Sequence, residues 1–147
     1  MSKTISYRGT VPIGVEEKIR LKTNTGKTGY KITQFQIIGT APGTGNVEYV
    51  GKITNVKDPN VGATVNFTNS DLLAVSYLKE GASEDKPFSQ GIIFDNQVVN
   101  QDIFVAISDA AGGTTPCNYY IELETMNLSD LQTTQVTLKN MRQVTSR

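Results

Sequence analysis

The sequence predicts an all-β fold: a single antiparallel β-sandwich, jelly-roll-like, with an extended C-terminal arm. The first observation is that segments of β-branched and aromatic residues alternate with polar ones at period two. The second is that turn residues separate these segments at short intervals. The third is that no room is left for the crossover helices of a parallel sheet. At 147 residues the chain is long enough for one domain. We expect the sandwich over residues 1–128 and the arm, or a final edge strand, over 129–147.

The chain before residue 101 has the pattern of strands joined by polar turns. The first strand is expected to end near Pro12, which lacks a backbone donor. In the strongest central strand the alternation slips between Ile32 and Phe35, which predicts a β-bulge there. Strands are expected over residues 4–13, 15–23, 30–39, 46–56, 63–67 and 90–95.

Residues 72–80, LLAVSYLKE, are ambiguous. Ser70 is a suitable N-cap for a short helix. A strand would instead place Val75 and Tyr77 on one face, and short apolar runs do not discriminate between the two. Both alternatives therefore stay open from the sequence.

Residues 101–125 read as two strands and the loop between them, a hairpin on which the sandwich is organised. The loop over residues 109–116 contains Gly112, Gly113 and Pro116, which turn or stop a strand. A lone hairpin is marginal in water, so the other strands must cover it. Both runs are expected to turn their most apolar residues inward: Ile103, Val105, Ile121 and Leu123.

The C-terminal stretch has a different composition. Apolar residues become sparse after Asn127, and no acidic residue follows Asp130. One interpretation is a final edge strand with a frayed end. The other is an arm that adds to a neighbouring subunit. The residues expected to contact that partner are Val136, Leu138, Lys139, Met141 and Arg142.

Composition argues against several classes of function. Lys and Arg number 14, as do Asp and Glu, so no excess positive charge favours nucleic acid or acidic membranes. With no histidine, a Ser-His-Asp or Cys-His centre cannot form, and the commonest metal ligand is missing. No apolar run approaches a membrane span. We expect no enzyme activity, no cofactor and no metal, and we interpret the single cysteine, Cys117, as a packing residue.

Three groups of residues partly match known catalytic or ligand-binding motifs. Glu122 and Glu124 share one strand face, as a glycosidase pair would, but solvated carboxylates are favoured. Gly26-Lys27-Thr28 ends like a phosphate loop, but the expected glycine is missing and a strand follows. An acidic loop lacks calcium-loop spacing and is interpreted as solvated: Glu80, Glu84 and Asp85.

The chain resembles small structural proteins of marine tailed bacteriophages. The similar segments are TNTGKTGYKITQFQIIGTAPGTGNVEYVGKI, IFDNQVVNQDIFVAISDAAGGTTPCNYYIELE and NLSDLQTTQVTLKNMR. The resemblance implies a virion protein, made in the host cytoplasm, that binds capsid or other virion proteins as a homo-oligomer or on a lattice. It brings no catalytic residues.

Among virion roles, a capsid decoration or cement protein is favoured, because the chain is one domain with an arm and lacks repeats. A head–tail connector or tail protein is the alternative within the virion. The rival from another class is a carbohydrate-binding β-sandwich used for receptor binding. Its aromatic platforms would come from five tyrosines: Tyr30, Tyr49, Tyr77, Tyr119 and Tyr120.

Overall fold

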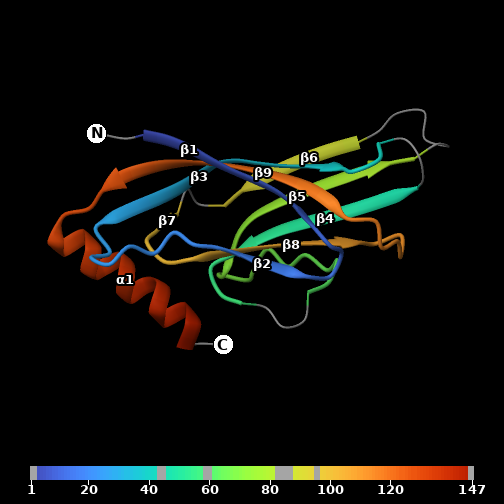
Figure 1. Cartoon of the computed structure of the whole chain (residues 1–147). Helices are drawn as coiled ribbons and strands as arrows, with labels where there is room; N and C mark the ends of the chain where they lie inside the picture. The colour runs from blue at the N-terminus through green and yellow to red at the C-terminus, as the bar shows by residue number, and fades with distance from the viewer. Residues whose placement is uncertain (1–2, 43–45, 58–60, 82–87, 95–96, 146–147) are drawn as a thin grey trace.

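The computed structural model describes residues 3–42, 46–57, 61–81, 88–94 and 97–145, with the backbone alone at 88 and 140–145. Two antiparallel sheets pack together as a sandwich, which confirms the predicted all-β class (Figure 1). The first sheet has the strand order β1-β9-β3-β7 and the second β2-β8-β4-β5-β6. The strands are β1 (Lys3–Val11), β2 (Glu16–Ile19), β3 (Thr28–Gly39), β4 (Val47–Thr54), β5 (Leu72–Glu80), β6 (Phe88–Ile93), β7 (Val98–Val99), β8 (Ile103–Asp109) and β9 (Cys117–Asn127).

The strand pairing is nested. β1 pairs with β9, β2 with β8, β3 with β7 and β4 with β5, each antiparallel. In addition β9 lies beside β3, and β8 lies beside β4. The early strands therefore pair with the late ones in reverse order along the chain.

The core lies between the sheets. The predicted inward phase is confirmed, because Ile103, Val105, Ile121 and Leu123 are completely buried. Chain segments far apart in sequence thus meet in one apolar layer, whose burial supplies the main driving force for folding. β1 ends at Val11, directly before Pro12, as expected.

The predicted irregularity in β3 is also confirmed. Ile32 pairs with Leu123 and Gln34 with Glu122, so Thr33 is an extra residue, as in a β-bulge. The Thr33 hydroxyl donates to the Glu122 carbonyl at 3.1 Å. The bulge restores the inward phase, and Phe35 and Ile37 return to the core.

The predicted hairpin over residues 101–125 is wrong. β8 belongs to the second sheet and β9 to the first, and each already has neighbours on both sides. The Asp109 carboxylate accepts hydrogen bonds from the backbone N–H groups of Glu48 and Ala111, at 3.1 and 2.9 Å. These bonds tie the end of β8 to β4, and the chain then crosses to the other sheet. Alternation identifies the buried face of a strand, but it does not identify the strand's partner.

Residues 72–80 form the strand β5, so a helix beginning at Ser70 is wrong. Pairing with β4 on one side and β6 on the other decides the ambiguity. The strand expected over 63–67 is also wrong, since residues 61–71 form a loop. Lys52 Nζ donates to the Thr64 carbonyl at 3.0 Å and holds this loop against β4.

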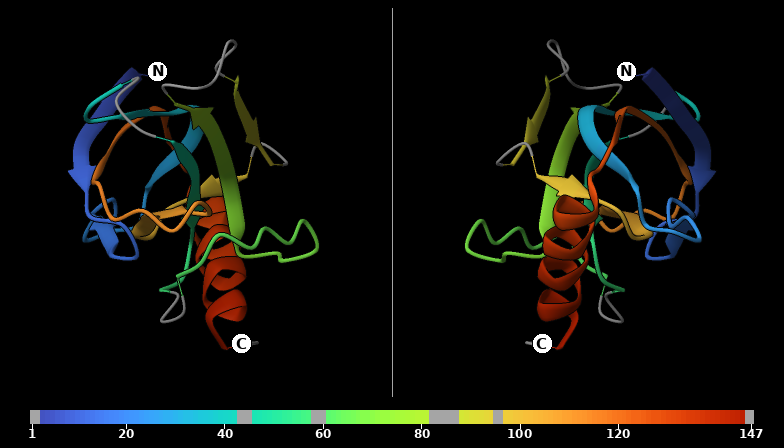
Figure 2. Two further views of the ribbon diagram at one scale, coloured as in Figure 1. Left: turned by 90° about the vertical axis from the view of Figure 1, so that its right-hand side faces the viewer. Right: turned by 90° about the vertical axis from the view of Figure 1, so that its left-hand side faces the viewer.

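The C-terminal segment corrects the prediction of an extended arm or edge strand. Residues Asp130–Thr145 form α1, a helix at one end of the sandwich (Figures 1 and 2). Sparse apolar residues suggested a strand because Val136 and Leu138 alternate. The same sparse set is compatible with a helix that packs one narrow face against the sandwich, and Thr133, Val136 and Thr137 are half-buried on that face.

Candidate functional site

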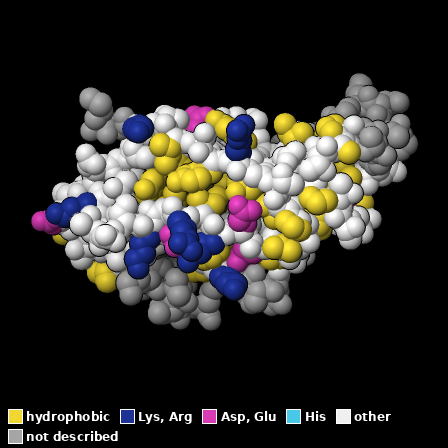
Figure 3. Space-filling view, viewed as in Figure 1, with side chains coloured by type: hydrophobic (Ala, Val, Ile, Leu, Met, Phe, Trp, Pro, Cys, Tyr) yellow, Lys and Arg dark blue, Asp and Glu magenta, His cyan; other side chains and the backbone are white. Residues whose placement is uncertain are grey.

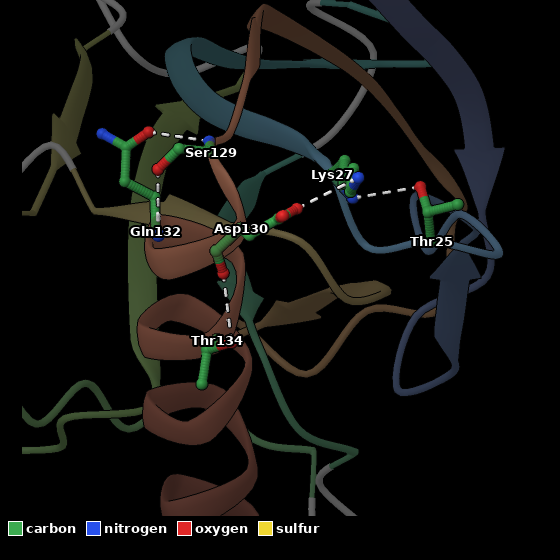
Figure 4. Close-up of polar contacts among 6 residues, drawn as sticks. All are labelled: Thr25, Lys27, Ser129, Asp130, Gln132 and Thr134. Carbon is green, nitrogen blue, oxygen red and sulfur yellow. Dashed lines mark hydrogen bonds and ion pairs between the residues drawn. The ribbon is translucent and has the colours of Figure 1, made fainter.

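The helix α1 begins with a capping box. The backbone N–H of Gln132 donates to Ser129 Oγ at 3.2 Å, and the Gln132 carboxamide oxygen accepts from the Ser129 N–H at 2.9 Å (Figure 4). Two N-terminal donors that would lack partners are thereby satisfied. Asp130 lies in the first turn, where negative charge is favourable, and forms an ion pair with Lys27 at 3.0 Å.

Contacts on the inner side fix α1 to the sandwich. The Asn100 side chain is completely buried, and its Nδ2 donates to the Gly26 carbonyl at 3.1 Å and to Thr137 Oγ1 at 2.6 Å. Gly26 has φ of 67°, and a Cβ there would lie 3.3 Å from Asn100 Nδ2. Leu128, just before the helix, is buried, and its N–H donates to the Lys27 carbonyl at 2.7 Å. The helix is therefore seated on the turn before β3.

The two sides of α1 differ in exposure. Thr133, Val136 and Thr137 are half-buried on the side that meets the sandwich. Leu131 and Leu138 are 68% and 51% exposed. Being seven residues apart, they lie two turns apart on one side of the helix, about 10 Å along its axis. We call Leu131, Leu138 and the neighbouring Lys139 the outer face of α1.

The residues predicted to contact a partner are divided by this helix. Val136 is turned toward the sandwich, whereas Leu138 and Lys139 are exposed on the outer face. Met141 and Arg142 lie in α1, but their side chains fall outside the described part. Sequence reasoning missed Leu131, because its relation to Leu138 appears only at helical spacing. The signal for the helix was Ser129-x-x-Gln132, a capping-box pattern.

A second candidate attachment surface comprises two loops, 40–45 and 109–116. The structure brings them together: the Thr40 hydroxyl donates to the Pro116 carbonyl at 3.0 Å. The hydroxyl of Tyr49 donates to the Thr115 carbonyl at 3.1 Å, which braces the second loop. Residues 43–45 lie outside the described residues.

The carboxylates considered for catalysis lie on the outer surface of the first sheet. Glu122 and Glu124 are half-buried there, and Glu122 accepts a hydrogen bond from the Tyr120 hydroxyl at 3.1 Å. The nearby hollow of about 420 Å³ includes neither glutamate. Its lining consists of Arg8, Gly9, Thr10, Asn118, Tyr119 and Tyr120.

The remaining candidate residues are Cys117, the Gly26-Lys27-Thr28 segment and the acidic loop. Burial, and secondly the nearby charge of Glu80, raise the pKa of the Cys117 thiol to about 12, so its reactive thiolate is disfavoured. Gly26-Lys27-Thr28 forms a turn and the start of β3, without the helix that a phosphate loop requires. Among the described residues, no group of three His, Cys, Asp or Glu could hold a metal. Of the predicted acidic loop, Glu80 ends β5, and Glu84 and Asp85 lie outside the described residues.

The five tyrosines do not form an aromatic row on the surface. Tyr30, Tyr49 and Tyr119 are buried in the core. Tyr77 is half-buried over the second sheet, and Tyr120 is 36% exposed on the first. Tyr120 is thus the one accessible ring of the five on the outer surface of the first sheet.

Comparison with known proteins gives no family for this chain. No protein-family model matches it, and neither a curated protein nor a solved structure matches it. Within the described residues, no helix has the length and apolarity needed to cross a bilayer.

Proposed function

We propose that this chain is a structural protein of a tailed-phage virion, a capsid decoration or cement protein that binds other virion proteins through the outer face of α1. The proposal includes localisation in the virion and no enzymatic role. It starts from the sequence resemblance, and three features of the molecule support it.

The nested strand pairing supports a jelly-roll assignment. A jelly roll arises when one long antiparallel hairpin rolls into two sheets, so that the first strand meets the last and the second meets the last but one. The pairs β1–β9, β2–β8, β3–β7 and β4–β5 follow this order, with β6 added at an edge. Jelly rolls are a common architecture of viral capsid domains and of lectins.

The observation that carries the proposed function is an ordered helix with an unpartnered outer face. The capping box and the Asn100 contacts hold α1 in place. Leu131 and Leu138 nevertheless remain exposed, although the inner side of the same helix packs on the sandwich. A partner that covered both leucines would meet a preorganised surface and would lose little conformational entropy on binding.

The charge of α1 indicates the chemistry of the partner. After Asp130 the remaining charged residues of the chain are Lys139, Arg142 and Arg147, all positive. A complementary surface would present an apolar patch for Leu131 and Leu138, with carboxylates at its margin. Opposite charges at the margin of an interface favour the correct orientation and a fast encounter.

A binding assay on particles tests this proposal. Leu131→Ser/Leu138→Ser is compared with a matched control, Val15→Ser/Ile38→Ser, whose residues are 50% and 58% exposed on the sandwich. We expect the helix variant to lose binding to particles that lack the protein, and the control to bind as the wild type does. Equal binding by both variants would show that the outer face of α1 is not the attachment surface.

Glycan binding is a second candidate, favoured by the surroundings of Tyr120. Arg8 and Gln36 occupy the strand positions on either side of Tyr120, and Thr10 Oγ1 donates to Asn118 Oδ1 at 2.6 Å beside it. An accessible ring among hydrogen-bonding side chains is the arrangement that sugar rings require. A glycan array with Tyr120→Ala as control tests it, and the absence of any Tyr120-dependent signal would exclude this candidate.

A further inference from the structure

We propose that the β6 edge of the second sheet pairs with the β6 edge of a second copy of this chain, giving a two-fold dimer with a continuous sheet. This inference does not depend on the proposed virion function. It rests on how the free sheet edges differ from one another and on a groove beside one of them.

Unpaired sheet edges attract other strands, and proteins usually protect them with charges, proline or shortness. Three of the four edges in the described structure have such protection. β1 carries Lys3 and Arg8, β2 carries Glu16, Glu17 and Lys18, and β7 consists of two residues. Figure 3 faces the β1 and β2 edges and shows charged side chains of both signs along that side of the molecule.

Within its described residues, β6 has none of these devices. Its sequence, FSQGII, contains neither a charge nor a proline over six residues. Ser89, Gln90 and Gly91 are exposed, and β6 pairs with β5 on one side only. Within the described residues, no side chain donates to or accepts from its outer edge. Figure 2 shows β6 on the side of the sandwich opposite to β1.

An apolar groove lies directly beside this edge. It has a volume of about 390 Å³ between β5, β6 and the 61–71 loop, and Phe67 at its margin is 61% exposed. The Phe67 ring contacts the Phe94 ring edge-on, with centroids 5.0 Å apart. The lining is uncharged: Val65, Phe67, Val75, Tyr77, Gln90 and Ile92.

The loop that presents Phe67 is ordered by its own hydrogen bonds. Asn66 Oδ1 accepts from the Thr68 N–H at 3.0 Å, and Asn69 Oδ1 accepts from the Asp71 N–H at 3.0 Å. These are Asx turns, which fix a loop without burying it. The hydrogen-bonded 61–71 loop therefore keeps the Phe67 ring largely exposed to solvent, which favours a partner that covers the ring.

A second copy of the chain would pair with the free edge of β6 and would also lie beside the apolar groove. Identical edges are complementary in antiparallel pairing about a two-fold axis, the commonest symmetry of homo-oligomers. No like charges oppose one another across such a seam, because FSQGII has none. A two-fold axis perpendicular to the sheet keeps Gln90 and Ile92 of both copies on one surface. The two grooves then lie on either side of the seam, where each copy can cover the other's apolar lining.

The test measures the dissociation constant of the dimer by analytical ultracentrifugation from low to high micromolar concentration. Gln90→Lys places like charges near each other across the seam, and Phe67→Ser removes the exposed ring. The matched controls are Ser6→Lys and Ile38→Ser, both exposed on the outer surface of the first sheet. We expect a wild-type dimer, a rise of about tenfold or more in Kd for the two β6-side variants, and no change for the controls.

Hydrogen exchange gives an independent readout at the seam. The amides of β6 in the wild type should gain protection as concentration rises, and those of Gln90→Lys should not. A wild type that stays monomeric throughout overturns the proposal, and so does a dimer that Gln90→Lys leaves intact. Equal weakening by Ser6→Lys would also overturn it, because Ser6 lies on β1, on the side of the sandwich opposite to β6.

Discussion

The hydroxyl of Tyr119 donates a hydrogen bond to Glu17 Oε1 at 2.8 Å, and this bond joins the two sheets near the β1 and β2 edges. Tyr119 comes from β9 in the first sheet and Glu17 from β2 in the second. The ring passes beneath Gly9 of β1, where a Cβ would lie 3.0 Å from the tyrosine. Because glycine at position 9 has no side chain, the Tyr119 ring fits beneath β1 and its hydroxyl reaches Glu17 across the open side of the sandwich.

The hydrogen bond between Tyr119 and Glu17 predicts a loss of stability at alkaline pH. Burial, and then hydrogen bonding to the Glu17 carboxylate, raise the pKa of Tyr119 well above its ordinary value of 10.0. The neutral phenol is thus favoured by folding. Its contribution is complete below pH 10 and is lost as pH rises toward the raised folded pKa. Tyr119→Phe should cost about 1 kcal/mol at neutral pH and should flatten the decline above pH 10.

Urea unfolding at a series of pH values measures both effects. Tyr120→Phe is the matched control, because its ring is exposed and its hydroxyl donates to Glu122 on the surface. The control should follow the wild-type curve. If the stability of Tyr119→Phe declined at alkaline pH as that of the wild type does, the hydrogen bond between Tyr119 and Glu17 would not contribute to the alkaline loss.

Asp102 predicts a second pH dependence, at the acidic end. Burial acts to raise its pKa, but hydrogen bonds from the backbone N–H groups of Lys22 and Leu21, and then Lys18, outweigh burial and lower it. Folding therefore favours the ionised form. Its contribution is present above the ordinary pKa of 3.8 and is lost as pH falls through the lowered folded pKa.

The variant Asp102→Asn should destabilise the protein by about 1–3 kcal/mol at neutral pH and should show a smaller loss on acidification. Thermal melts between neutral pH and the acid limit measure this difference. Asp130→Asn provides a comparison, since Asp130 is exposed. A wild type and an Asp102→Asn variant that decline in parallel on acidification would contradict the role given to this carboxylate.

Because alternate residues of β9 face the core, substitutions at adjacent positions should lower the free energy of unfolding by unequal amounts. Ile121 is completely buried, so Ile121→Ala should cost about 2–5 kcal/mol through lost burial and a residual cavity. Glu122→Ala removes a half-buried carboxylate from the polar surface and should cost about 0.5 kcal/mol or less. Denaturant titration of the two variants checks this, and equal or reversed costs would be incompatible with the register.

The capping box predicts that Ser129 controls the order of α1. Ser129→Ala should cost the helix about 0.5–2 kcal/mol, because the Gln132 N–H loses its acceptor. Ser129→Asp retains an acceptor at the N-cap and should stay close to the wild type. Hydrogen exchange of the α1 amides measures the difference. If both variants exchanged equally fast, the cap would not be what orders the helix.

The sequence predicted the faces of the strands better than their partners. Alternation placed Ile103 and Ile121 in the core, and a slip in phase located the bulge at Thr33. It suggested a hairpin between β8 and β9 because neighbouring strands often pair. The pairing is instead decided by non-local contacts, such as Asp109 with the Glu48 backbone. Local patterns contain no information on such contacts.

The candidate site was predicted only in part, for a related reason. Leu138 and Lys139 were expected at the surface, but Val136 was counted with them and Leu131 was omitted. Period two and period 3.6 select different neighbours from the same sparse residues. The decisive local signal was the Ser129–Gln132 pair, and the decisive non-local one was Asn100, which no periodicity identifies.

Cryo-microscopy of the intact particle, with this chain located in the map, tests the proposed virion role most directly. The account predicts density for the sandwich on the capsid exterior, with α1 against the shell and Leu131 and Leu138 covered. Density in a connector ring, tail or fibre would contradict the decoration role. A sandwich on the capsid that left the outer face of α1 in solvent would contradict the attachment surface.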